Sequence, residues 1–285
     1  VASGNYTENI DYNGKNIVVK SLDGIYSVEL SPFIDSVPIV WFHNNESQSA
    51  VLDGFIIKDG GDIRGSGINF SQGSATIRNC LITNCQGNAI EIYYTSAIIS
   101  NCLIFGNDEV FFFDPGSTDP QIINCTIVGN NNLGSNGNGD YQPKFKNCII
   151  SNEASPEFGN VDITYSLVEG GWPGEGNIDT DPHLKTVGWG YLLHNYSPCI
   201  GAGTSTDAPT TDIEGNPRPD PEGSSPDMGA YENAREIPHV YTVDDYVIID
   251  EDSDSTTWVA YNDYNIHWSE DSLYIFQEPA HGTAE

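Results

Sequence analysis

One Asn-Cys dipeptide returns through the middle of this 285-residue chain at steps of 22, 23 and 23 residues. The four copies are Asn79-Cys80, Asn101-Cys102, Asn124-Cys125 and Asn147-Cys148. A fixed period in the twenties indicates a solenoid, in which each repeat packs only on its neighbours. This repeat constrains the fold more than any other feature of the sequence.

Several kinds of solenoid have repeats of this general size. Leucine-rich repeats need several leucines per unit, and these units contain one or none. Helical repeats need an apolar rhythm of about 3.6 residues over ten or more positions, which is missing here. Short β-branched runs separated by polar turns are typical of a parallel β-helix. The sequence therefore predicts an all-β fold built on a parallel β-helix.

Each repeated asparagine is expected to mark a bend between two strands. Ala75 and Ile77 share one strand face and Cys80 and Ile82 share the next, so the alternation slips at Asn79. Asparagine tolerates the left-handed backbone that such a bend requires. With coils about 4.8 Å apart, stacked asparagines can hydrogen-bond along the axis and stacked cysteines can fill the core. The ladder is expected to contain Asn79, Asn101, Asn124 and Asn147, with Cys80, Cys102, Cys125 and Cys148 inside it. Free buried thiols are expected, with disulfides as the alternative that the stacking distance also permits.

Neighbouring segments extend the predicted stack in both directions. The third strand of successive coils is expected at residues 67–70, 89–93 and 109–113. Earlier coils are expected at 16–20 and at 52–57, where Gly54 takes the place of the cysteine, and a shortened last coil at 163–168. The Gly/Asn-rich stretch 130–140 is interpreted as an insertion loop.

The charge of the chain excludes two classes of partner. Forty-one acidic residues face ten basic ones, which gives a net charge of −31. Such a field repels nucleic acid and anionic membranes. No apolar run reaches the roughly 18 residues of a membrane-spanning helix. A polar but weakly charged composition is common in extracellular β-rich proteins, so an extracellular or cell-surface location is expected.

Acidic and aromatic side chains on neighbouring coils are the candidate functional residues. A carboxylate pair can serve glycoside hydrolysis or bind calcium, and a basic residue can act as the base of a lyase. The candidate catalytic residues are Glu91, Glu109, Asp114 and Arg78. Exposed aromatic rings can stack on sugars, and the candidates are Tyr93, Tyr94, Phe111 and Phe113. A solvated acidic surface and ordinary core packing are the alternative interpretations of these two sets.

The densest acidic cluster lies near the end of the chain. It contains Asp250, Glu251, Asp252 and Asp254. This cluster is the candidate metal site, and calcium is the one cofactor expected. The alternative interpretation is a solvated acidic turn.

Further segments resemble a known family. Residues 6–17 and 52–57 resemble the opening coils of bacterial right-handed parallel β-helix repeat proteins. Residues 179–184, 197–203, 212–218 and 227–232 resemble the terminal signature of those helices, called the choice-of-anchor Q region. The resemblance implies a right-handed helix and a secreted or cell-surface protein. It implies no single activity, because such helices serve as lyases, hydrolases, adhesins and scaffolds.

The tail resembles a different module. Residues 243–246, 250–253 and 277–283 resemble the first half of bacterial cadherin-like, immunoglobulin-like modules. The predicted division is therefore coils at 1–168, a capping region at 169–234 and a partial β-sandwich at 235–285. Half a sandwich has an open sheet edge, which favours self-association into fibres by strand complementation.

Two functions follow as expectations. The first is a structural or adhesive protein of the cell surface, with other surface proteins or a polysaccharide as partners. The alternative is a polysaccharide lyase or glycoside hydrolase that acts on acidic glycans, with Glu91, Glu109 and Asp114 in its cleft. The sequence leaves open whether the chain is an enzyme.

Overall fold

All regular secondary structure in the described residues is β-structure. A computed structural model describes residues 1–61, 65–114, 119–136, 142–151, 161–235 and 238. These residues form three parallel sheets and one antiparallel hairpin. None of them forms a helix of the length and apolar character needed to cross a membrane. The tail predicted to be a partial β-sandwich lies almost wholly outside the described residues.

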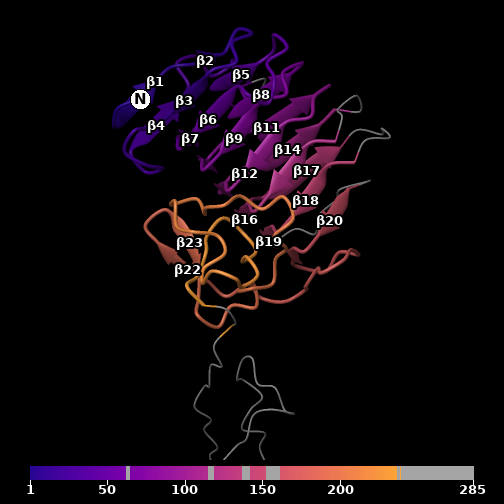
Figure 1. The fold of residues 1–285 in the computed structure, drawn as a ribbon. Coiled ribbons are helices and arrows are strands. Elements are labelled where there is room, and N and C mark those ends of the chain that lie inside the picture. The colour runs from indigo at the N-terminus through magenta and orange to yellow at the C-terminus, as the bar shows by residue number, and fades with distance from the viewer. Residues whose placement is uncertain (62–64, 115–118, 137–141, 152–160, 236–237, 239–285) are drawn as a thin grey trace, which may run out of the picture.

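The three sheets run side by side along the molecule (Figure 1). Sheet A contains β1 (Gly4–Thr7), β4 (Val28–Ser31), β7 (Ile56–Lys58), β10 (Leu81–Thr83), β13 (Leu103–Phe105), β16 (Thr126–Val128), β19 (Ile149–Ser151) and β21 (Leu167–Val168). Sheet B contains β2 (Ile10–Asp11), β5 (Val40–Phe42), β8 (Ile68–Ser71), β11 (Asn88–Tyr93), β14 (Glu109–Phe113) and β17 (Asn132–Asn136). Sheet C contains β3 (Val18–Lys20), β6 (Val51–Asp53), β9 (Thr76–Arg78), β12 (Ile98–Ser100), β15 (Gln121–Ile123), β18 (Lys144–Lys146) and β20 (Asp162–Thr164). The hairpin contains β22 (Leu184–Val187) and β23 (Gly190–Leu193).

Each coil passes once through all three sheets. From β9 in sheet C the chain enters β10 in sheet A, then β11 in sheet B, and returns to sheet C as β12, which pairs with β9 in parallel. Aliphatic and aromatic side chains from the three sheets meet in one continuous core. The prediction of a right-handed parallel β-helix is confirmed.

The repeated asparagines lie at the bend from sheet C to sheet A. Asn79, Asn101, Asn124 and Asn147 all have left-handed backbones, with φ values of 51°, 49°, 49° and 54°. Tyr165 takes the same place in the last coil, with a φ of 49°. The predicted bends are confirmed, and the last coil shows that the bend does not depend on asparagine alone.

Two details of the predicted repeat are wrong. Asp53 pairs with Arg78, so Gly54 aligns with Asn79 and Phe55 takes the place of the cysteine. Gly54 has a φ of 86°, because the bend again needs a left-handed residue. The stretch 130–140 is not simply an insertion loop, since β17 occupies residues 132–136 and pairs with β14.

The asparagine ladder forms, but in two pieces. In the first, the Nδ2 of Asn101 donates to Oδ1 of Asn79 at 3.3 Å, and the Nδ2 of Asn79 donates to Oδ1 of Asp53 at 2.8 Å. In the second, the Nδ2 of Asn147 donates to Oδ1 of Asn124 at 3.2 Å. No hydrogen bond joins Asn124 to Asn101, so the first piece ends at Asn101 and the second begins at Asn124.

A cap formed by residues 169–235 interrupts the ladder. The Nδ2 of Asn124 donates to the carbonyl oxygens of Asp227 and Gly229, at 3.1 and 3.4 Å, rather than to Asn101. The Oδ1 of Asn101 is consequently buried without a hydrogen-bond partner. The ladder thus serves as a docking edge for the cap as well as a tie between coils.

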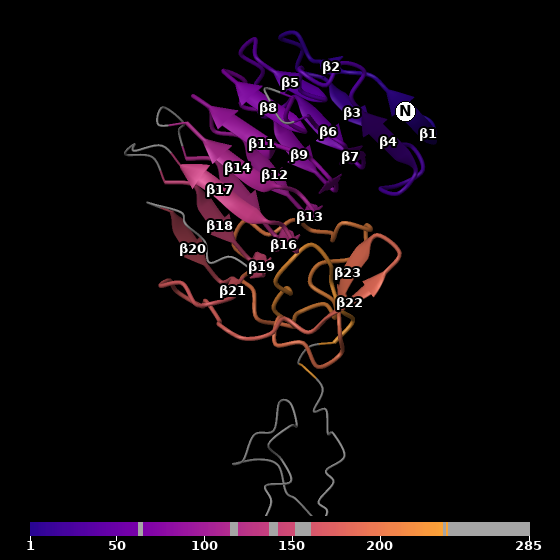
Figure 2. The ribbon, with the colours of Figure 1, turned by 180° about the vertical axis from the view of Figure 1, so that it is seen from behind.

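The cap also covers the outward side of sheet A. One outward row of that sheet is almost entirely apolar, and cap residues pack on it in two clusters. The row contains Ile56, Leu81, Leu103, Thr126, Ile149 and Leu167. Both views place the cap beside β16 and β19 and away from β5, β8 and β11 (Figures 1 and 2). The outward side of sheet B is therefore left uncovered by the cap.

The cap approaches sheet A most closely at Gly229. A Cβ atom there would lie 2.7 Å from both Cδ1 of Ile149 and Oγ1 of Thr126, and the φ of Gly229 is 93°. Gly223 has the same φ of 93°, but nothing lies within 4 Å of its Cβ position.

This pair of glycines permits a matched test of cap docking. We expect Gly229→Ala to lower the free energy of unfolding by about 1–3 kcal/mol more than Gly223→Ala, because only the former adds a steric clash. Both variants share the left-handed backbone cost of about 1–2 kcal/mol. Urea unfolding of the two proteins measures the difference. Equal losses would mean that the cap does not pack on Thr126 as described.

All six cysteines are buried and free. The expected inward stack of Cys80, Cys102, Cys125 and Cys148 is present in the core. Burial raises the pKa of Cys85 to about 12 and that of Cys199 to about 12. Since the thiolate is the reactive form, these two thiols are expected to be inert in the folded protein.

Thiol titration tests this arrangement. We expect no reaction with an aromatic disulfide reagent in the native protein at pH 8, and reaction of all six thiols after unfolding in guanidinium. The control is the same titration of protein that has first been reduced, which should give the same number of reactive thiols. Fewer than six reactive thiols without reduction would show that disulfides form.

Candidate functional site

The uncovered side of sheet B carries the predicted acidic candidates. In β11, Ala89 and Ile90 both lie in the core, so the alternation slips and Asn88, Glu91 and Tyr93 face outward. In β14, Val110 and Phe111 lie in the core in the same way. A consistent slip of this kind in neighbouring strands keeps the outward residues in register.

We name the outward residues of sheet B the open face. It contains Asp11, Trp41, His43, Asn69, Ser71, Asn88, Glu91, Tyr93, Glu109, Phe112 and Asp114. One row along the helix axis runs Asp11, Trp41, Asn69, Glu91 and Phe112, which pair in that order. The structure thus brings Glu91, Glu109 and Asp114 together on one surface, as expected.

Of the four aromatic candidates, only Tyr93 and Tyr94 have exposed surface. Phe111 and Phe113 are fully buried in the core, so their prediction as sugar-binding residues is wrong. The slip in the alternation turns Phe112 outward instead, and Phe112 packs against Tyr93 with ring centroids 5.3 Å apart. Tyr94 is 63% exposed and follows β11 with a φ of 54°, so it lies at the edge of the open face.

Glu91 is held in place from two sides. The Nδ2 of Asn69 donates to its Oε2 at 2.7 Å, and the Nδ2 of Asn88 donates to its Oε1 at 3.2 Å. Asn69 comes from the preceding coil and Asn88 from the same strand. Amide donors on both oxygens fix the orientation of the carboxylate, so Glu91 presents a preorganised acceptor.

A second aromatic group lies toward the N-terminal end of the open face. Trp41 and His43 stack with ring centroids 3.9 Å apart. The Nε1 of Trp41 donates to Oγ of Ser71 at 2.9 Å, and the Nε2 of His43 lies 3.1 Å from Oδ1 of Asp11. Sequence reasoning missed Trp41, because β5 lies outside the Asn-Cys repeat that set the expected strand alternation.

Tyr93 stays protonated at ordinary pH. Burial, together with the charges of Glu91 and Asp114, raises the pKa of Tyr93 to about 12. The phenol therefore offers a neutral ring next to two acidic side chains.

Arg78 is not part of the open face. It lies on sheet C, where its Nε and one terminal nitrogen contact Oδ2 of Asp53 at 3.1 and 3.0 Å. Lys20 lies 3.6 Å from the same oxygen. Because Arg78 faces away from Glu91 and is paired with a buried carboxylate, the structure does not bring it to the predicted acids as their base.

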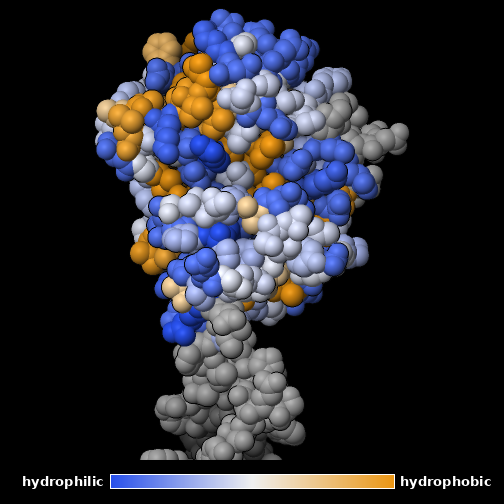
Figure 3. Space-filling view, viewed as in Figure 1, coloured by the Kyte–Doolittle hydropathy of each residue, from blue (hydrophilic) through white to orange (hydrophobic). Residues whose placement is uncertain are grey.

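A cleft of about 660 Å³ lies between residues 20–27 and cap residues 211–215. Asp53 and Asn79 lie on its floor, and the half-exposed ring of Tyr26 lines one wall. Figure 3 shows hydrophobic surface over the N-terminal coils above the cap, and Leu22 at the rim of the cleft is 75% exposed. The carboxylate of Asp53 is already paired with Lys20 and Arg78 and accepts a hydrogen bond from Asn79, so it is not free to bind a ligand.

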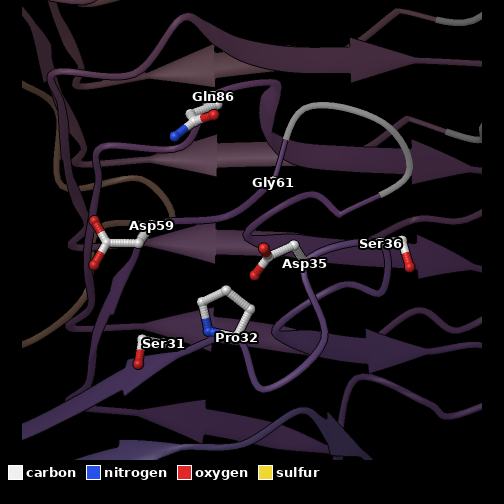
Figure 4. A pocket seen from close by; sticks show the side chains of 7 residues that line it. All are labelled: Ser31, Pro32, Asp35, Ser36, Asp59, Gly61 and Gln86. Carbon is white, nitrogen blue, oxygen red and sulfur yellow. The ribbon is translucent and has the colours of Figure 1, made fainter.

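A polar hollow of about 580 Å³ lies on the opposite bend, from sheet A to sheet B (Figure 4). Asp35 and Asp59 both line it, but Figure 4 shows the carboxylate of Asp59 turned away from Asp35. Asn84 donates a hydrogen bond to Asp59. The two acids therefore do not converge on a common point.

The predicted metal site cannot be placed. Asp250, Glu251, Asp252 and Asp254 lie outside the described residues. Within the described ranges, no group of three or more His, Cys, Asp or Glu side chains is arranged to hold a metal ion.

Comparisons with known proteins find a family match over the middle coils of the chain. A family model described as the right handed beta helix region matches residues 40–166. A crystal structure of pectate lyase Pel9A is similar with a TM-score of 0.34 and 16% identity, over 81% of this chain and 86% of that one. No curated protein matches the chain. A structural similarity of this size assigns neither a substrate nor a reaction.

Proposed function

We propose that this chain is a secreted or cell-surface β-helix protein that binds a glycan polymer along the open face. The observation that carries the proposal is the placement of Trp41, Tyr93 and Phe112 around the fixed carboxylate of Glu91. Aromatic rings offer flat apolar surfaces to sugar rings, and a held carboxylate accepts hydrogen bonds from hydroxyl groups.

The dimensions of the open face suit an extended ligand. Trp41 and Phe112 belong to one row, with Asn69 and Glu91 between them. At about 4.8 Å per coil, the two rings lie roughly 14 Å apart along the axis. A polymer lying along the helix can therefore contact both rings and the acid between them.

Binding is favoured over cleavage by the placement of the basic candidate. A lyase needs a base near the bound sugar, and Arg78 lies on another sheet in contact with Asp53. We therefore propose an adhesive role, with a polysaccharide lyase or glycoside hydrolase as the alternative. Product analysis by chromatography after incubation with each bound glycan tests that alternative, and release of oligosaccharides would support it.

Removal of the outward rings is expected to weaken glycan binding. We expect Tyr93→Ala and Phe112→Ala each to lower affinity about 5-fold to 30-fold, as loss of a stacked aromatic contact would. Affinity electrophoresis or calorimetry with a glycan identified on an array measures the change. Trp189→Ala is the matched control, since Trp189 is 43% exposed but lies in the cap. An equal loss in all three variants would contradict a site on sheet B.

The surface location rests on the terminal signature at 212–218 and 227–232, which resembles the choice-of-anchor Q region. Calcium binding by the acidic cluster at 250–254 and fibre assembly through residues 235–285 remain predictions. Sedimentation of the chain with and without calcium tests both, since fibre formation predicts a concentration-dependent increase in size.

A further inference from the structure

Apart from His43, whose Nε2 lies 3.1 Å from Oδ1 of Asp11, the titratable side chains of the open face are acids and one phenol. Its titratable acids are Asp11, Glu91, Glu109 and Asp114, and it contains no Lys or Arg among the residues that the structure describes. Four of the ten basic residues lie instead on sheet C, namely Lys20, Arg78, Lys144 and Lys146.

Three nitrogen donors of the open face are already used within the protein. The indole nitrogen of Trp41 donates to Ser71, and the amides of Asn69 and Asn88 donate to Glu91.

The two asparagines that hold Glu91 also carry hydrogen-bond acceptors without a partner. The Oδ1 atoms of Asn69 and Asn88 have no hydrogen-bond partner and are buried. A buried acceptor without a partner is costly, so a rotation of either side chain that brings its oxygen to a donor of the ligand would relieve that cost.

We infer that the open face selects a glycan that carries ammonium groups, an amino-sugar polymer, and rejects polyuronates and sulfated glycans. This inference rests on the proposed function and specifies its ligand. It replaces the acidic glycan expected from the sequence, because a polyanion would meet like charges and surplus acceptors. Glu91 is the specificity-determining residue, since its fixed carboxylate lies between the two aromatic groups.

The physical basis is the pairing of charge and hydrogen bonding at one point. An ammonium group offers three donors and a positive charge, so it matches the carboxylate of Glu91, which the amide nitrogens of Asn69 and Asn88 hold in place. Steering by the net charge of −31 adds a general attraction for cations that salt screens. The experiment must therefore separate a specific contact at Glu91 from this general attraction.

Three hexasaccharides separate the outcomes. The full chain is titrated by calorimetry with glucosamine hexamer, N-acetylglucosamine hexamer and galacturonate hexamer, at pH 5.5 in 150 mM salt with EDTA. We expect glucosamine hexamer to bind at least about 10-fold more tightly than its acetylated counterpart, and galacturonate hexamer not to bind measurably.

Variants locate the contact. Glu91→Gln is expected to reduce affinity for glucosamine hexamer by about 10-fold and to remove the preference over the acetylated form. Glu109→Gln, on the same face, is expected to cause a smaller loss. Glu222→Gln removes an equal charge from the exposed surface of the cap and is expected to change nothing. Equal losses for Glu91→Gln and Glu222→Gln would overturn the inference, because they would indicate general attraction only.

The inference and the proposed function fail in different ways. Binding of the acetylated or galacturonate hexamer with equal or greater affinity, abolished by Tyr93→Ala, would overturn the inference and retain glycan binding. Absence of binding to all three hexamers and to a glycan array would overturn both.

Discussion

Replacing Arg218 by methionine is expected to lower the free energy of unfolding by about 3–5 kcal/mol, the usual cost of breaking a buried ion pair. The side chain of Arg218 is 0% exposed, and its Nε lies 3.2 Å from Oε2 of Glu232, which is 1% exposed. The two atoms are close but not aligned as a hydrogen bond. Methionine keeps the aliphatic stem and removes the charge, which leaves Glu232 buried without a counter-ion.

The guanidinium also organises the backbone of the cap. Its terminal nitrogens donate to the carbonyl oxygens of Asp227, Gly229 and Ala230, at 3.3, 3.1 and 3.1 Å. Two of these carbonyls, those of Asp227 and Gly229, also accept from Asn124. Loss of Arg218 is therefore expected to loosen the cap from the asparagine ladder as well as to leave a charge unpaired.

Denaturant unfolding monitored by tryptophan fluorescence measures this effect. Lys144→Met is the matched control, because Lys144 pairs with Asp119 at 3.2 Å with both side chains about half exposed. An exposed pair contributes about 0–1 kcal/mol, so the control should be close to neutral. Similar small losses in both variants would mean that Arg218 does not hold the cap together.

The stacked coils could be predicted from the sequence because their physics is local and repeated. Asn79 and its equivalents mark a left-handed bend, and the same bend recurs at Gly54 and Tyr165, where the motif itself is absent. Gly54 lies 25 residues before Asn79 and Tyr165 lies 18 residues after Asn147, so these two bends follow from the strand pairing and not from the period of 22 or 23 residues. The alignment at Gly54 was off by one residue, since only the pairing of Asp53 with Arg78 fixes the register there.

The direction of the aromatic side chains could not be predicted by simple alternation. Val110 and Phe111 both enter the core, and this slip reverses the expected sides of Phe112 and Phe113. Glu91 and Glu109 do face outward as expected, and their role as catalytic residues stays a prediction. A slip of one residue in a strand exchanges its two faces, so simple alternation predicts the wrong side for every residue after the slip.

The role of the cap depends on contacts between distant parts of the chain. Thr126 accepts a hydrogen bond from the backbone nitrogen of Ala230, more than one hundred residues later. No periodicity in the sequence marks such a contact. The terminal segments could be recognised only by resemblance, and their buried charges became visible only in the folded cap.

The pH dependence of stability provides the second large effect. Burial, together with the neighbouring charge of Glu232, raises the pKa of Asp227 to about 8. Burial likewise raises the pKa of Glu232 to about 7, against the lowering effect of Arg218. In the unfolded chain both carboxyl groups titrate near pH 4.

The sign of the effect follows from proton uptake. Between about pH 4 and pH 8 the folded cap holds protons that the unfolded chain has released, so unfolding releases protons and stability falls as the pH rises. The contribution of these groups is fully present below about pH 4 and is lost as the pH passes through 7 to 8. We expect a loss on the order of 6 kcal/mol at most between pH 5 and pH 8, because each proton corresponds to about 1.4 kcal/mol per pH unit and is held over two to three units.

Asp227→Asn separates this titration from the general repulsion of an acidic molecule. Asparagine resembles the protonated carboxyl group, so the variant should match the parent protein at pH 5 and exceed its stability at pH 8. Asp119→Asn, at an exposed position, is the control and should follow the parent at every pH. The two oxygens of Asp227 accept backbone N–H groups of Gly201 and Asn233, both at 2.7 Å, which favours the charged form. A parent protein whose stability increases from pH 5 to pH 8, with Asp227→Asn less stable throughout, would show that these two hydrogen bonds outweigh burial and that the cap holds an ionised carboxylate.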